Sequence, residues 1–383
     1  MSPAARRAAS ARRSSEVTGE SYVQTNRLFQ RYFLFPMHTY LRSLTMLLVA
    51  APLADTAAPT VTTQASGTTQ RLQAVSPVTD QIVWASGTGG TYVKTTDGGD
   101  HWRAGVVPGA DSLEFRDVAA MDSMNAWLLA AGPGPASRIY RTNDGGATWA
   151  QQFVNTDSAA FFDCFAFWDA SHGIAVSDGV RGHFPILVTD DGGTHWTLRP
   201  TGESPAADSG EGAFAASGTC IVTGPGGRAW IGTGASPTGG GRVVATTDFG
   251  KTWASQQTPI QHGTTTTGIG SLAYRDATHA FAGGGDINPR APQTVRVART
   301  DDGGKTWVPI TPPGFAGGVY GLAAVPGTEG LVAVGPGGAA YSPDGRTVWL
   351  PLDSVSYWSA GFASAHAGWM VGPKGRIARI QVR

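Results

Sequence analysis

The chain has 383 residues, and its 28 Lys and Arg balance its 28 Asp and Glu, so its formal net charge at pH 7 is zero. Because only 15% of the residues are charged, the composition gives no support for a strongly charged substrate, and we exclude nucleic acid from the expected partners. The 53 glycines and 24 prolines are typical of many short strands joined by turns.

Residues 1–58 differ from the rest. Seven arginines come first, followed by an apolar run from Leu44 to Leu53 and then by small residues. This order is typical of a secretory signal peptide, and a run of about ten residues is too short to span a bilayer as a helix. We therefore expect an exported protein, periplasmic or secreted, with Met37 as an alternative start and no transmembrane span in the mature chain. A basic tail with a short apolar helix is the competing interpretation.

Residues 59–383 contain a motif that recurs six times at intervals of 42 to 57 residues, with the common form Ser/Thr-x-Asp-x-Gly-x-Thr/His-Trp. A period of this length indicates propeller blades or another repeat array. The Asp side chain and the Gly favour a tight turn, and the Trp begins the next strand. The sixth copy has Arg346 where Gly is expected, which predicts a distorted turn. The structural residues of the six copies are Asp97 and Trp102, Asp144 and Trp149, Asp191 and Trp196, Asp248 and Trp253, Asp302 and Trp307, and Asp344 and Trp349.

This motif resembles the Asp-box, or BNR repeat. A calcium loop is the alternative, but it needs several carboxylates and a terminal Glu, which no copy has. The two cysteines cannot build a zinc site, and the eight His show no ligand spacing, so we expect no metal.

In chain order, a strand is expected from Thr60 to Gln70 and seven strand-rich units follow. The units begin near Arg71, Leu113, Phe161, Gly212, Ile269, Val319 and Ser359. The seventh unit ends without a fourth strand, so the N-terminal strand is expected to complete it and close the ring. The predicted fold class is therefore all-β, a seven-bladed propeller with the repeated turns between third and fourth strands.

The face of the ring opposite the repeated turns carries the longest expected loops, 132–137, 177–183, 232–241 and 283–293. Loops on a rigid scaffold commonly hold binding sites. Four of the candidates lie near the starts of innermost strands and are expected to point into the channel mouth. A polar lining that wets the channel is the competing interpretation. The candidate ligand- or partner-binding residues are Arg116, Asp163, Asp178, Arg181, Glu211, Asp286, Arg290 and Tyr320, with His183 and Lys374 beside them.

Cys164 and Cys220 each lie in an apolar, strand-like run. An exported chain could oxidise them, but two buried thiols that pack as small hydrophobic residues are the interpretation we favour. The sequence shows no nucleophile elbow, no metalloprotease motif and no phosphate or dinucleotide loop, so no cofactor is expected. Asp163 with Glu211, or Asp178 with Asp286, are pairs that could serve glycoside hydrolysis if the fold brought them together.

The turns, together with 115–118, 137–142 and 368–372, resemble the photosystem II stability/assembly factor family. Residues 162–169 and 210–220 are more similar to a bacterial branch of that family found outside phototrophs. The resemblance implies a seven-bladed Asp-box propeller that binds an assembly client without catalysis. We therefore expect an exported, monomeric scaffold for a protein client. A sialidase-like glycosidase acting on a glycan at the channel mouth is the alternative, although the Arg-Ile/Leu-Pro motif of sialidases is missing here.

Overall fold

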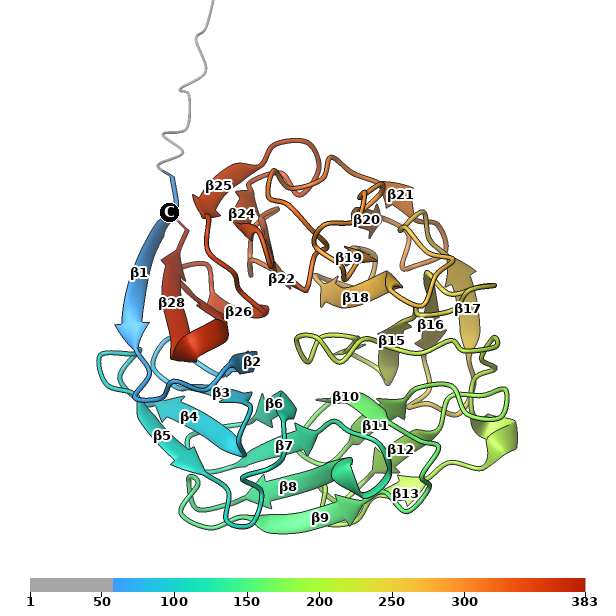
Figure 1. Ribbon diagram of the computed structural model, residues 1–383, viewed down its shortest axis with the longest axis horizontal. Helices are drawn as coiled ribbons and strands as arrows, with labels where there is room; N and C mark the ends of the chain where they lie inside the picture. The colour runs from blue at the N-terminus through green and yellow to red at the C-terminus, as the bar shows by residue number, and fades with distance from the viewer. Residues whose placement is uncertain (1–57, 383) are drawn as a thin grey trace, which may run out of the picture. The chain divides into compact units, whose positions relative to one another are not determined.

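The computed structural model describes residues 58–382, and the predicted leader lies outside these residues except for its last position. The described residues form seven four-stranded antiparallel sheets placed around a common centre (Figure 1). This confirms the predicted all-β, seven-bladed propeller. Each of the first six blades consists of four consecutive strands, and the seventh combines β26, β27 and β28 with β1.

The strands fall into four classes by their distance from the centre of the ring. The innermost strands are β2 (Leu72–Pro77), β6 (Phe115–Ala120), β10 (Phe162–Phe167), β14 (Ile221–Gly224), β18 (Thr267–Tyr274), β22 (Gly321–Ala324) and β26 (Ser359–Ser364). The second strands are β3 (Val83–Gly87), β7 (Ala126–Ala130), β11 (Gly173–Ser177), β15 (Arg228–Gly232), β19 (Ala280–Asp286), β23 (Leu331–Gly335) and β27 (Ala367–Val371). The third strands are β4 (Thr91–Thr95), β8 (Arg138–Thr142), β12 (Ile186–Thr189), β16 (Arg242–Thr246), β20 (Val297–Thr300), β24 (Gly338–Ser342) and β28 (Arg376–Gln381). The outermost strands are β5 (Arg103–Val106), β9 (Ala150–Val154), β13 (Thr197–Leu198), β17 (Ala254–Gln257), β21 (Val308–Pro309), β25 (Leu350–Asp353) and β1 (Thr60–Ala65).

The hydrophobic core lies between neighbouring blades. All residues of β7, with the sequence AWLLA, are buried, because a second strand packs against another blade on each face. Short continuous apolar runs of this kind are typical of fully buried strands. The outermost strands face water, and β17 is exposed along its whole length. In the described part of the chain, three 3-10 turns lie in loops: η1 (Gly134–Ala136), η2 (Thr201–Glu203) and η3 (Pro373–Gly375). None of the helices in residues 58–382 has the length and apolar character needed to cross a membrane.

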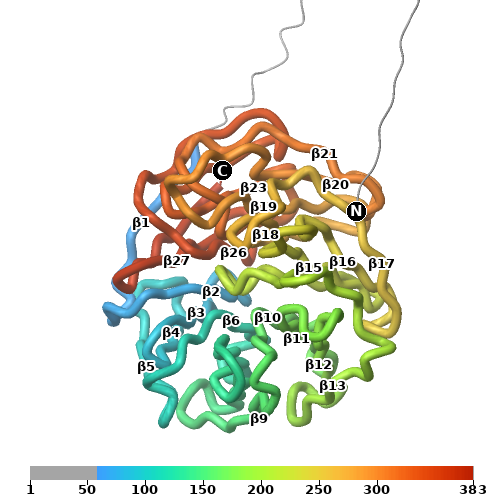
Figure 2. The backbone as a smooth tube through the Cα atoms, turned by 45° about the vertical axis from the view of Figure 1, so that its right-hand side comes forward, coloured from blue at the N-terminus to red at the C-terminus, as the bar shows by residue number. Residues whose placement is uncertain are grey.

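The ring is closed by the pairing of β1 with β28, as predicted from the missing fourth strand of the seventh unit. The register runs from Thr60 opposite Gln381 to Ala65 opposite Arg376. Figures 1 and 2 both show the blue β1 alongside the red C-terminal segments. Gln64 joins this strand to blade one as well, because its Oε1 accepts hydrogen bonds from the indoles of Trp102 and Trp369, both at 3.1 Å. The strand is shorter than expected and ends at Ala65 instead of Gln70.

The repeated turns join third to fourth strands and share one hydrogen-bond network. In the fifth turn, the Thr300 hydroxyl donates to Asp302 Oδ1 at 2.8 Å and accepts from the Gly304 N–H at 2.8 Å. The Asp302 carboxylate also accepts from the N–H and the hydroxyl of Thr306. The sixth turn differs from the others, as Arg346 predicts: the hydroxyl that bonds Asp344 comes from Thr347, three residues later, while the Val348 N–H four residues later is at 3.3 Å.

The two cysteines form a disulfide, so the prediction of free thiols is wrong. Cys164 lies on the innermost strand of blade three, and Cys220 directly precedes the innermost strand of blade four. Adjacent innermost strands converge on the centre of the ring, which brings the two Cα atoms to 6.0 Å, within the range a disulfide spans. The apolar surroundings of each cysteine carry no information about this proximity.

Thr300→Val should lower the free energy of unfolding by about 1–2 kcal/mol, because the Gly304 N–H and the Asp302 carboxylate lose a partner while the side chain keeps its shape. Urea unfolding measures this change. Lys305→Ala alters an exposed side chain of the same turn and is the control. An equal loss in both variants would contradict the role of the hydroxyl.

Gln64→Ala should destabilise the closed ring by about 2 kcal/mol, because the indole N–H groups of Trp102 and Trp369 lose their acceptor. Thr62→Ala, in an exposed position of the same strand, should have little effect. Thermal unfolding of both variants compares them directly. If the two midpoints agree, Gln64 adds nothing to closure beyond the strand itself.

Candidate functional site

The predicted loop-rich face is formed by the connections between second and third strands together with the chain that enters each innermost strand. Neighbouring connections are linked to one another around this face. Pro133 bridges Phe161, and Gly212 pairs with Gly234, which in turn bridges Gly268. The Tyr320 hydroxyl donates to the carbonyl of Ile287 at 2.9 Å. The face is therefore a continuous surface and not a set of independent loops.

Five half-buried side chains form a chain of contacts on this face, and we call them the mouth arc: Tyr320, Trp358, Arg71, Glu114 and Arg116. The rings of Tyr320 and Trp358 meet edge to face, with centroids 5.3 Å apart. The Arg71 guanidinium lies over the Trp358 ring at 4.8 Å and contacts Glu114 at 3.3 Å. Arg116 binds the same carboxylate at 2.8 Å. The arc thus spans blades six, seven, one and two.

Beyond Arg116 lie two neighbouring carboxyl groups, the buried Asp163 and the half-buried Asp178, and Oδ2 of Asp163 has no hydrogen-bond partner among the described residues. Asp163 is only 2% exposed, and burial together with the neighbouring charge of Asp178 raises its pKa well above the ordinary value. Burial also raises the pKa of Asp178 to about 6. The Arg116 charge acts on Asp163 in the opposite direction. Burial therefore favours the protonated form of Asp163 more strongly than that of Asp178.

Two β-bulges set the directions of the Arg116 and Asp163 side chains. The register between β6 and β7 shifts between Phe115 and Asp117, and that between β10 and β11 shifts between Phe162 and Cys164. Arg116 and Asp163 are the extra residues of these bulges, and a bulge redirects a side chain out of the regular alternation of a strand. Strand alternation alone therefore could not give their direction.

Glu211 does not stand free at the channel mouth. It is 1% exposed, and its two carboxylate oxygens accept from Arg242 at 2.8 and 2.6 Å. The prediction that blade four begins near Gly212 is also wrong, because its innermost strand begins at Ile221. The run from Gly212 to Phe214 looked like a strand from its small and apolar residues, but it belongs to a loop.

This loop closes the centre of the ring, and we call residues 213–219 the plug. The Ser217 carbonyl accepts from the Ser359 hydroxyl of blade seven at 2.9 Å, and the Thr219 hydroxyl bonds Ser271 of blade five at 2.6 Å. A Cβ on Gly218 would lie 2.3 Å from Asp117 of blade two. In Figure 1 a yellow-green loop leading into blade four reaches the middle of the ring. Residues 213–219 therefore fill the centre of the ring. They do not form the expected channel with a polar, solvated lining.

The remaining candidates lie further out. Asp286 lies close to the mouth arc. Burial raises the pKa of Tyr320, and the nearby charge of Asp286 raises it further. Its carboxylate accepts from the Asn288 N–H at 2.8 Å, and the exposed Arg290 lies on the same loop. Arg181 pairs with Asp157 at 2.7 Å beside a hollow of about 250 Å³ between blades two and three, which His183 also lines. These two residues are not part of the mouth arc.

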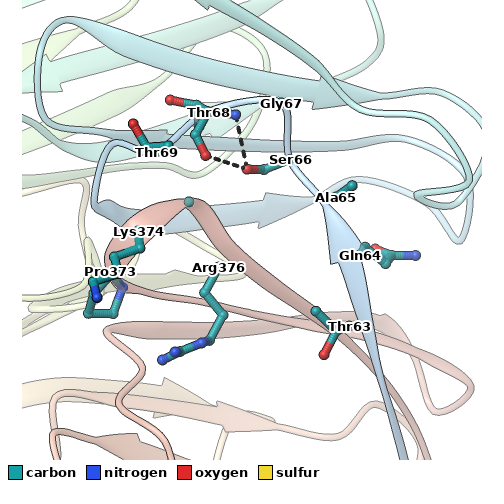
Figure 3. A pocket seen from close by; sticks show the side chains of 11 residues that line it. Thr63, Gln64, Ala65, Ser66, Gly67, Thr68, Thr69, Pro373, Lys374 and Arg376 are labelled. Carbon is teal, nitrogen blue, oxygen red and sulfur yellow. Dashed lines mark hydrogen bonds between the residues drawn. The ribbon is translucent and has the colours of Figure 1, made fainter.

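Lys374 lies in the connection between the second and third strands of blade seven. It lines a shallow hollow formed by residues 63–69 and 373–376, and Figure 3 shows these two segments facing each other. Neighbouring Arg376 donates to the Ser356 carbonyl at 2.7 Å and lies over the Tyr357 ring. The hollow therefore borders the point where the ring closes.

Sequence reasoning missed Arg71, Glu114 and Trp358. Each stands at the same place as Tyr320, immediately or almost immediately before an innermost strand. That shared position was a usable signal, but their partners come from other blades and could not be paired in advance. Within residues 58–382 there is no group of three or more His, Cys, Asp or Glu side chains arranged to hold a metal ion.

No family model matches the chain, and no curated protein matches its sequence. Solved structures do match. YCF48 bound to D1 peptide has a TM-score of 0.60 at 16% identity, covering 85% of this chain and 97% of that chain. YCF48 from Cyanidioschyzon merolae has a TM-score of 0.62 at 15% identity, covering 84% and 99%. This chain has their fold. The GH74 enzyme of Niastella koreensis matches with a TM-score of 0.56 at 15% identity, over 83% of this chain and 53% of that chain. Identities this low show a shared seven-bladed propeller and nothing finer.

Asp163→Asn should make the protein more stable than wild type at pH 8, with a smaller difference at pH 4. Because burial raises the pKa of Asp163, the folded wild type loses stability as pH rises above the ordinary value of Asp, near 4. The Asn amide has no titrating proton, so the variant does not undergo this loss. Between pH 4 and 8 we expect the difference in free energy of unfolding to grow by about 1–3 kcal/mol. Thermal unfolding across this range measures it, and parallel pH profiles would contradict the assignment.

Proposed function

We propose that the protein is an exported scaffold that binds a segment of a client protein on the mouth arc. The observation that carries this proposal is the contact chain of Tyr320, Trp358 and Arg71, in which two aromatic rings and a guanidinium stay partly exposed on one surface. Trp, Tyr and Arg are the residues most enriched at binding hot spots. The arc is also held in place before binding, which lowers the entropy cost of association.

The plug supports a macromolecular partner over a small molecule. A small ligand would need a concave site that encloses most of its surface, but residues 213–219 fill the centre below the arc. The face above the plug is therefore closed at its centre and bordered by polar and aromatic side chains. A surface of this kind suits an extended protein segment, and YCF48, which has the same fold, has been solved bound to a peptide.

The carboxyl groups do not favour glycoside hydrolysis. Hydrolysis by two carboxyls needs about 5 Å between them for retention and about 6.5–9.5 Å for inversion. Asp163 and Asp178 are neighbours, since the charge of Asp178 raises the pKa of Asp163, and Glu211 is held by Arg242. This arrangement supports a binding protein over a sialidase-like enzyme, which was the alternative.

We further propose that the chain is related to the Asp-box propellers of the photosystem II stability/assembly factor type. The hydrogen bonds of the six repeated turns and the shared fold with YCF48 support this relationship. The Cys164–Cys220 disulfide supports export, because disulfides persist in oxidising compartments. The proposed relationship and the proposed export both go beyond the shared fold.

Photo-crosslinking tests the client. The full chain, produced in its own host with a benzophenone amino acid in place of Tyr320, should form one dominant adduct with another protein on illumination. Arg71→Ala with Trp358→Ala should reduce that adduct at least tenfold, because truncating a hot spot costs about 2 kcal/mol or more. The same photo-reactive residue in place of Lys305, on the rim of the repeated turns, is the control.

The expected outcome is an adduct from position 320 that is missing from position 305, with both proteins unfolding at wild-type temperatures. The absence of an adduct, or equal amounts of adduct from positions 320 and 305, would contradict the client proposal. Fractionation of the same cells tests export. Recovery from the envelope or medium of a chain that lacks its leader would agree with export. Recovery of only the full-length chain, in the cytoplasm, would contradict it.

A further inference from the structure

One of the repeated turns differs from the others in a way that the fold does not require. In the turns of blades one, two, three and five, a glycine follows the key aspartate with a positive φ of 70° to 77°. In blade four this position is Phe249, and it keeps the same left-handed conformation, with φ of 61°. A residue with a Cβ reaches this conformation only at a cost, and such strain persists mainly at functional sites.

The Phe249 ring lies against two rings of blade three. Its centroid is 5.1 Å from that of Trp168 and 5.2 Å from that of His172. The orientation of Trp168 is fixed by the hydrogen bond from its indole N–H to the Arg228 carbonyl at 2.6 Å. Trp168, His172 and Phe249 are each half-buried, so part of every ring remains open to solvent.

These rings line a cleft of about 420 Å³ between blades three and four, which lie side by side in Figures 1 and 2. We call it the aromatic cleft. Its other charged lining residues are Asp190, Arg199 and Lys251. The cleft lies on the rim of the repeated turns, at the opposite ends of the strands from the mouth arc.

The charges of the cleft are largely balanced. Arg199 contacts Glu203 at 3.2 Å, and His172 contacts Asp169 at 2.9 Å. Asp190 and Lys251 have opposite charges and both are exposed. A cleft without excess charge does not select an anion or a cation. It offers fixed aromatic surface next to several hydrogen-bonding groups.

We propose that the aromatic cleft binds a neutral oligosaccharide. A sugar ring has an apolar face of C–H groups, which packs on aromatic rings, and an edge of hydroxyl groups, which bonds to carboxylate, ammonium and guanidinium groups. Phe249 and Trp168 supply the first, and Asp190, Lys251 and Arg199 supply the second. The strain at Phe249 is then the cost of placing a ring where a glycine would leave the cleft bare. This binding site is independent of the mouth arc and of the proposed client.

Calorimetric titration with cellohexaose, chitohexaose, maltohexaose and xylohexaose tests the proposal on the full chain. At least one of these probes should bind the wild type, and Phe249→Gly should weaken that binding at least tenfold. Lys251→Ala should also weaken it. Lys305→Ala changes the lysine at the same position of the next turn and should leave binding unchanged. Trp358→Ala, in the mouth arc, should leave it unchanged as well.

Thermal unfolding separates a binding role for Phe249 from a packing role. Phe249→Gly relieves the left-handed strain, so its unfolding midpoint should equal or exceed that of wild type while binding is lost. The proposal is overturned if none of the four sugars binds wild type at millimolar concentration, or if Phe249→Gly binds as well as wild type. A lower midpoint for Phe249→Gly, with sugar binding unchanged, would make the ring a packing residue only.

Discussion

The pairing of β1 with β28 is the constraint on which the other features of the ring depend. Each blade buries its faces only against its two neighbours, so a ring with one unfinished blade would expose a sheet edge and unpair the last interface. The register of β1 against β28 supplies the missing strand from the far end of the sequence. Gln64 then ties the closing strand to the turn and tryptophan of blade one. Closure is therefore a strand pairing strengthened by side-chain hydrogen bonds.

A closed ring leaves its centre to be filled, and this chain fills it with its own plug. The Cys164–Cys220 disulfide holds the C-terminal end of the plug to blade three, and hydroxyl groups of Ser359 and Ser271 hold it to blades seven and five. The side chains just above the plug are consequently presented outward as a surface, which is what the mouth arc needs.

The two faces of the ring have different chemistry because strands alternate in direction. One rim holds the repeated turns, where exposed carboxylates are saturated by backbone N–H groups and hydroxyls, and the pKa of Asp144 is lowered to about 2 by its bonds to Thr148 and Thr142. Such turns are structural and stay charged. The other face combines open aromatic rings, two arginines and the buried Asp163, whose pKa is raised by burial. Because the carboxylates of the repeated turns hold the fold, side chains on the other face can vary without losing it.

The sequence by itself determined the number of blades, the place of the turns and the closing strand, because all three follow from local patterns repeated along the chain. It also pointed to Arg116, Asp163 and Tyr320 through their position at or near the starts of innermost strands, and to Asp178 through its place in a long loop. Only the tertiary structure decided what these residues touch. The disulfide, the plug, the ion pair of Glu211 with Arg242 and the stacking of Arg71 on Trp358 all join different blades or distant segments. Contacts of this kind depend on the curvature of the ring and on strand bulges, which no periodicity in the sequence encodes.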